Sequence, residues 1–110
     1  MDVTGRLGEF EALVLSAVVR VEDEANGVAV FEHLKTIVGD EISLAAVHVT
    51  LRRLEDKGLL SSETGTSSDR GGRPRRFYRP TPSGVRALSS FRDLWRRAFR
   101  GLVLPDEGAR

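Results

Sequence analysis

The chain has no cysteine, a single tryptophan and a single tyrosine among its 110 residues, and no long uninterrupted apolar run. Without cysteine there is no disulfide framework, no thiolate nucleophile and no cysteine-ligated zinc. The longest apolar stretch, residues 12–19, is interrupted by Ser16, and Glu9 and Glu11 precede it. It is too short to span a bilayer and too acidic at its start for a signal peptide, so we expect a cytoplasmic protein without a membrane partner.

The composition is that of a small globular domain. Hydrophobic residues make up 40% of the chain and charged residues 30%, a balance that argues against intrinsic disorder. A chain of this length buries roughly 60 to 70% of the surface that its unfolded form exposes, so we expect a single hydrophobic core.

The net charge of +1 conceals a strong asymmetry along the chain. Residues 1–51 contain three basic and nine acidic side chains, whereas residues 52–100 contain thirteen basic and five acidic ones. All the basic residues except Lys35 and Lys57 are arginines, whose planar guanidinium group suits bidentate contacts with phosphate and guanine. The second half of the chain therefore suits a polyanionic partner.

Apolar residues three and four positions apart predict four helices, over residues 7–21, 27–38, 43–57 and 81–102. Asn26, Ser43 and Thr81 stand at the starts of the last three, where N-caps are expected. Gly39 and Gly58 follow the second and third, where a left-handed glycine often ends a helix.

The third predicted helix has two different faces. One face combines four apolar residues, which we assign to the core: Leu44, Val47, Leu51 and Leu54. The opposite face is small near its start and cationic further along, a pattern that suits close approach to a nucleic acid.

Two short strands, residues 59–64 and 75–80, are predicted before the last helix, joined by a loop without large apolar residues. A helix pair, an extended link, a third helix and a basic hairpin make up a winged helix-turn-helix. We therefore expect a mainly α protein with a small β-hairpin (α+β). Its expected parts are a DNA-binding domain over residues 1–80, a C-terminal dimerisation helix over 81–104 and a flexible tail over 105–110.

Three segments resemble the PadR family of bacterial transcriptional regulators. They are LGEFEALVL (7–15), ISLAAVHVTLRRLEDKGLL (42–60) and GGRPRRFYRPTPSG (71–84), in the family's order and at its separations. The resemblance implies a winged-helix DNA-binding repressor that dimerises through its C-terminal helix, often with help from the first helix. It places the recognition helix on residues 43–57 and the wing on residues 64–76.

The sequence departs from the family pattern at four positions. Asn26 replaces an aromatic residue before the retained Gly27, Ala45 replaces a glycine, and Pro80 stands where leucine is commoner. His48 replaces a tyrosine of the family's recognition helix that contacts a phosphate or a base, and histidine at this position can also donate a hydrogen bond.

These patterns give a set of expected DNA contacts. The residues assigned to base edges are Ala45, Ala46, His48, Val49 and Arg52. The residues assigned to the phosphate backbone are Ser43, Arg53, Arg70, Arg73, Arg75 and Arg76. The alternative for Arg52 and Arg53 is a solvated helix face paired with Glu55 and Asp56, and the alternative for the loop arginines is solubility alone.

The first and last helices carry apolar seams that we assign to a homodimer interface. The residues assigned to it are Leu7, Phe10, Val14, Leu88, Phe91, Trp95, Ala98 and Leu102. Trp95 has two candidate roles, as an interface anchor or as a contact for a small planar aromatic effector.

No pattern indicates an enzyme, a metal site or a cofactor. His33 and His48 lack neighbouring ligands, and no nucleophile stands beside a base. We expect a sequence-specific regulator of double-stranded DNA, in particular a repressor that acts as a homodimer on an inverted repeat. The alternative from another class is a winged-helix protein-interaction module without DNA binding; an RNA-binding winged helix is disfavoured because no aromatic stacking platform is apparent.

Overall fold

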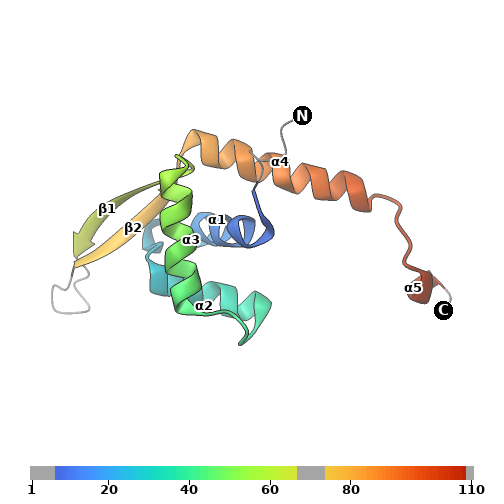
Figure 1. Ribbon diagram of the computed structural model, residues 1–110, viewed down its shortest axis with the longest axis horizontal. Helices are drawn as coiled ribbons and strands as arrows, with labels where there is room; N and C mark the ends of the chain where they lie inside the picture. Colours follow the sequence, from blue (N-terminus) through green and yellow to red (C-terminus); the bar gives the residue numbers. More distant parts are fainter. Residues whose placement is uncertain (1–6, 67–73, 109–110) are drawn as a thin grey trace.

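The computed structural model of the chain describes residues 7–66 and 74–108 (Figure 1). The elements, in chain order, are α1 (Glu9–Val21), a short 3-10 helix η2 (Glu22–Glu24), α2 (Gly27–Val38), α3 (Leu44–Asp56), β1 (Leu60–Thr66), β2 (Pro74–Pro80), α4 (Pro82–Phe99) and α5 (Pro105–Gly108). The mainly α architecture with a small β-hairpin that the sequence predicts is confirmed.

The helix ends follow the local signals in the sequence. Three N-cap side chains accept a hydrogen bond from the backbone N–H three residues on: Asn26 from Ala29 (2.9 Å), Ser43 from Ala46 (3.1 Å) and Thr81 from Gly84 (3.0 Å). These bonds satisfy donors that the first helical turn leaves free. Gly39 has a φ of 94° and Gly58 a φ of 77°, so both predicted glycine stops are confirmed.

The core lies where α1, α2 and α3 meet. Its largest fully buried side chains are Val14, Leu15, Val18, Val30, Leu34, Val47, Leu51, Leu54 and Leu60. Three of the four residues assigned to the core face of α3 are therefore buried. Leu44 is the exception at 37% exposed, because it occupies the first turn of α3, where that helix has not yet reached the core.

The hairpin is fixed to the helical core at its base. β1 and β2 pair antiparallel, with Leu60 opposite Pro80 at the base and Glu63 opposite Phe77 further out. The backbone N–H of Tyr78 donates to the carbonyl oxygen of Ala25 (2.9 Å), between η2 and α2. The segment between η2 and α2 therefore both leads into α2 and fixes the hairpin in place.

Helix α4 begins in close contact with the domain and then leaves it (Figure 1). The hydroxyl of Thr81 donates to the carbonyl of Gly58 (2.7 Å), and a β-carbon on Gly84 would collide with the backbone carbonyl of Leu59. From Trp95 onward every residue of α4 is exposed. The radius of gyration is 16.2 Å, whereas a compact domain of this length has about 13 Å.

The C-terminal part differs in detail from the prediction. α4 ends at Phe99 rather than near Leu102, and Gly101, with a φ of 72°, turns the chain away from the helix axis. Pro105–Gly108 then forms a single helical turn. Within the described residues, no helix combines the length and hydrophobicity that crossing a bilayer requires.

Candidate nucleic-acid interface

One face of α3 is exposed along its whole length. Ala45, His48, Val49 and Arg52 lie on it, and all four are exposed, with Val49 at 55%. Each of them is three or four residues from at least one other, so together they form a single strip on one side of the helix. The remaining predicted base reader, Ala46, is half-buried at the edge of this strip. The strip therefore faces solvent in the described structure, and only the ring of His48 also contacts another helix.

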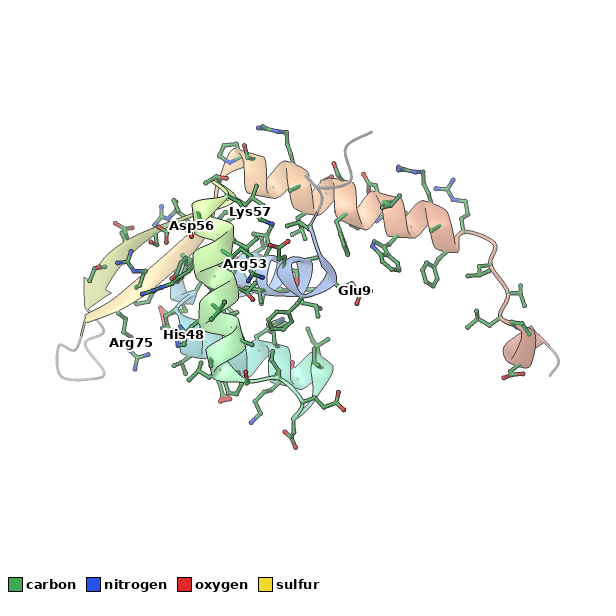
Figure 2. The ribbon with its side chains drawn as sticks, in the orientation of Figure 1. Glu9, His48, Arg53, Asp56, Lys57 and Arg75 are labelled. Atoms are coloured by element: carbon green, nitrogen blue, oxygen red, sulfur yellow. The ribbon has the colours of Figure 1, made fainter. Side chains whose placement is uncertain are left out.

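The two arginines of α3 point to different sides. Arg53 projects toward α1 (Figure 2), and its charge contributes to lowering the pKa of Glu11. Arg52 lies on the same strip as His48. Both arginines are exposed, and among the described residues neither forms an ion pair with Glu55 or Asp56.

His48 projects from α3 toward the same side as Arg75 of β2 (Figure 2). Its imidazole ring lies against the backbone of Gly27, the first residue of α2. The ring is therefore exposed to a ligand on one side and supported by α2 on the other. Sequence reasoning singled out His48 and did not identify Gly27 as its neighbour, because contacts between helices leave no periodic signal.

Ser43 lies at the exposed N-terminus of α3. Its hydroxyl oxygen caps the helix by accepting from the backbone of Ala46, so it is the local cap that the sequence predicts. The positive end of the helix dipole and the free N–H groups of the first turn lie beside it, and both favour a nearby anion.

The hairpin carries arginines beside α3. Arg76 donates from Nη1 to the hydroxyl of Ser62 (2.8 Å), which in turn donates to Oε2 of Glu55 on α3 (2.6 Å). This chain of hydrogen bonds connects the hairpin to α3. Arg75 is half-buried, and its Nε finds no hydrogen-bond partner within 7–66 and 74–108. Arg70 and Arg73 lie outside the described residues.

Tyr78 belongs to the packing of the domain. It is 7% exposed, and burial, followed by the charge of Glu55, raises the pKa of its phenol. The phenol is therefore neutral at physiological pH, and its position on the inner face of β2 makes it a support for the hairpin.

A second surface lies between α1 and α4. It is an open groove of about 450 Å³, lined by Glu9, Ala12, Leu13, Ser16, Leu88, Phe91, Arg92 and Trp95. Phe91, Trp95 and Phe99 continue along α4 as an aromatic stripe, with ring centroids 5.7 Å apart at each step. Trp95 is 40% exposed and Phe99 is 55% exposed, so the outer part of the stripe faces solvent.

The structure corrects two of the residues that the sequence assigns to the dimer interface. Leu7 is 8% exposed and Val14 is fully buried, and both belong to the core of the domain. Their assignment to the interface is wrong, because side chains inside the core cannot touch a second chain. Phe10 is half-buried against the core, while Ala98 and Leu102 are exposed. Leu13 and Ser16, which are half-buried, and Phe99, which is exposed, belong to this surface, and the sequence reasoning missed them.

The described part of the chain, residues 7–66 and 74–108, holds no group of three His, Asp or Glu side chains arranged to bind a metal ion. His33 and His48 are on different helices.

Comparison with solved structures shows the same architecture in several regulators. A PadR family transcription regulator from Clostridium difficile R20291 has a TM-score of 0.72 and 22% identity, over 84% of this chain and 93% of that chain. A PadR-like transcriptional regulator from Bacillus cereus has a TM-score of 0.70 and 21% identity, over 84% and 85%. At these identities the likeness establishes the fold.

A closer sequence match comes from Eggerthella lenta DSM 2243. Its PadR family transcriptional regulator is 31% identical, with a TM-score of 0.65 over 81% of this chain and 76% of that chain. No curated protein sequence matches the chain. The family model described as "Transcriptional regulator PadR-like family" matches residues 14–90, which include the helix-turn-helix and the hairpin together. The chain therefore belongs to the PadR-like family of transcriptional regulators, which are DNA-binding proteins and not enzymes.

Proposed function

We propose that this regulator is a repressor that binds an inverted-repeat operator as a homodimer. The observation that carries the proposal is the exposed strip of Ala45, His48, Val49 and Arg52 on α3, without ion pairs to neighbouring carboxylates in the described structure. A helix of this kind enters the major groove, where Arg52 is suited to guanine and small side chains permit close approach.

The backbone contacts follow from the elements on either side of the strip. Ser43 and the first turn of α3 would meet one phosphate, and Arg53, Arg75 and Arg76 would meet others. Arg76 is already held by Ser62, so its phosphate contact would extend an existing hydrogen-bonded chain. Arg70 and Arg73 are assigned to the same backbone from the sequence alone.

Dimerisation is supported by the part of α4 that leaves the domain. Its aromatic stripe is exposed beyond Phe91, and burying such a surface against a second copy is favourable by about 25 cal/mol per Å². A single winged helix makes few base contacts, and two copies related by a two-fold axis double them. The third helices of such a dimer would enter successive major grooves about 34 Å apart.

The experiment that tests the proposal uses the full chain and a pool of randomised 30-bp duplexes, selected at physiological salt. A DNA-binding repressor should enrich an inverted repeat, and a promoter carrying that repeat should lose activity when the protein is present. Enrichment of no sequence would contradict DNA recognition and favour the protein-interaction alternative. An increase of promoter activity would contradict repression.

Trp95 also supports a second proposed property, the binding of a planar aromatic effector. It lines the groove beside Leu88 and Phe91, and its indole is accessible. Stacking of a planar compound there should change the fluorescence of this single tryptophan. Unchanged fluorescence across a panel of planar aromatic compounds, with DNA binding intact, would rule out that property.

A further inference from the structure

Gly27 and His48 are in contact across the helix-turn-helix. A β-carbon built on Gly27 would lie 2.7 Å from Nδ1 and 3.1 Å from Nε2 of His48, and it would come closer still to Cε1. Real β-carbons do not approach other heavy atoms within 3.0 Å. The present position of the imidazole ring is therefore available only because residue 27 has no side chain.

The backbone itself does not require glycine at position 27. The described glycines with positive φ are Gly39, Gly58 and Gly101, each just after a helix, whereas Gly27 is the first residue of α2 and has ordinary helical geometry. Alanine is a better helix former than glycine by about 1 kcal/mol in a helix interior. As far as the backbone is concerned, alanine at this position would be tolerated or favourable. The steric reason for glycine is the neighbouring ring of His48.

The atoms that would collide belong to a side chain that can move. His48 is exposed, and rotation about χ1 would carry its ring away from α2. At Gly84, by contrast, the colliding atoms belong to the backbone of Leu59, which cannot rotate away. Alanine at position 27 would therefore leave the fold intact and displace the His48 ring.

We propose that Gly27 is a specificity-determining residue, which holds the His48 imidazole against α2 in the orientation in which it contacts DNA. The proposal rests on the proposed DNA binding by the α3 strip. A ring held in one place directs its nitrogen atoms to one base or phosphate, and a ring that must be ordered on binding loses affinity and selectivity. Gly27 acts through His48 and does not itself touch DNA, so it is a positioning residue.

The test is a double-mutant cycle with Gly27→Ala and His48→Ala. The probe is the duplex most enriched by the wild-type protein from the randomised pool. Gly27→Ala should weaken binding about tenfold, which corresponds to about 1.4 kcal/mol, and His48→Ala should weaken it similarly. In the His48→Ala background, Gly27→Ala should change affinity less than twofold, because the ring that it displaces is gone.

Two measurements separate positioning from damage to the fold. Thermal unfolding of Gly27→Ala should occur at or above the wild-type temperature. The matched control is Gly8→Ala, whose β-carbon would meet only Oε1 of Glu11 at 3.7 Å, and it should bind the probe like the wild type. A weakened Gly8→Ala variant, or an unfolded Gly27→Ala variant, would overturn the proposal.

The surroundings of the His48 ring can also be measured in the absence of DNA. The ring nitrogens of His33 and His48 can be followed by heteronuclear NMR in the free protein, and Gly27→Ala should shift only the signals of His48. Unshifted signals, or an equal effect of Gly27→Ala with and without His48, would overturn the proposal. If the wild type selects no duplex, the proposed DNA binding fails, and the NMR signals still decide whether Gly27 holds the ring.

Discussion

The Nζ atom of Lys57 lies 2.7 Å from Oε2 of Glu11, and this ion pair joins the end of α3 to the start of α1. The other carboxylate oxygen, Oε1, accepts from the backbone N–H of Gly8 (2.9 Å), so the same side chain also caps α1. Burial alone would raise the pKa of Glu11. The hydrogen bonds from Lys57 and Gly8, together with the charges of Lys57 and Arg53, outweigh burial and hold the pKa below its usual value.

The ion pair predicts an acid-dependent contribution to stability. Because the pKa of Glu11 is lower in the folded than in the unfolded state, the stabilisation is complete above the unfolded pKa of about 4.3 and is lost as the pH falls through the folded pKa. Glu11→Gln should lower the free energy of unfolding at pH 7 by about 1 to 3 kcal/mol, and the difference from wild type should shrink below about pH 4. Urea unfolding at several pH values measures both quantities.

Glu9→Gln is the matched control, since Glu9 is an exposed carboxylate in the same turn of α1. It should leave the free energy of unfolding nearly unchanged. A gap between wild type and Glu11→Gln that stayed constant from pH 7 to pH 3 would mean that the charge of Glu11 does not stabilise the fold.

Arg52 and Arg75 should contribute to DNA binding in different ways. Arg52→Ala should weaken operator binding by about 1 to 3 kcal/mol and relax the base preference at one position of each half-site. Arg75→Ala should lower affinity evenly across sequences and reduce the salt dependence by about one charge. Titrating both proteins with the selected duplex and its single-base variants, at several salt concentrations, measures these effects. Identical behaviour of Arg52→Ala and Arg75→Ala would contradict the assignment of Arg52 to a base and Arg75 to a phosphate.

Local features of the fold could be predicted from the sequence because their causes are local. The caps at Asn26, Ser43 and Thr81 and the stops at Gly39 and Gly58 each depend on one residue and its immediate neighbours. The exposed strip of α3 followed from helical spacing in the same way. The end of α4 was predicted too late, because the apolar spacing continues to Leu102 while Gly101 already turns the chain.

Contacts between distant segments could not be predicted from periodicity. Glu11 and Lys57 are 46 positions apart, and nothing in either helix alone selects the other as a partner. Gly27 and His48 meet only because α2 and α3 cross at that point. Val14 was assigned to the dimer because α1 is apolar on several sides, and spacing does not tell which side faces the domain itself.

Val49 should recognise the methyl group of a thymine. It is 55% exposed on the strip that we assign to base edges, and the methyl group is the apolar feature of the major groove. Replacing that thymine by uracil removes one methyl group, whose burial contributes about 0.8 kcal/mol, so affinity should fall about fourfold. Val49→Ala should bind the thymine and uracil duplexes equally. If every thymine of the half-site tolerates uracil, Val49 contacts no methyl group.

The exposed aromatic stripe of α4 predicts that Trp95→Asp yields monomers. A carboxylate in the middle of the stripe, between Phe91 and Phe99, would have to be desolvated in any interface formed there, and an unpaired buried charge costs several kcal/mol. In sedimentation velocity the wild type should have the mass of two chains and the variant the mass of one. The monomeric variant should also bind the operator more weakly than the wild type, because each monomer presents only one α3 helix to the DNA.

Ile37→Asp is the control for this variant. Ile37 is 58% exposed near the end of α2, so the same apolar-to-acidic change is made on a surface away from the stripe. This variant should keep the wild-type mass and bind the operator normally. A dimeric Trp95→Asp protein would show that the two-fold contact does not use the stripe. If Ile37→Asp were the monomeric variant, the dimer interface would lie at the end of α2. The distance between the two α3 helices of the dimer would then follow from that interface and not from the stripe on α4.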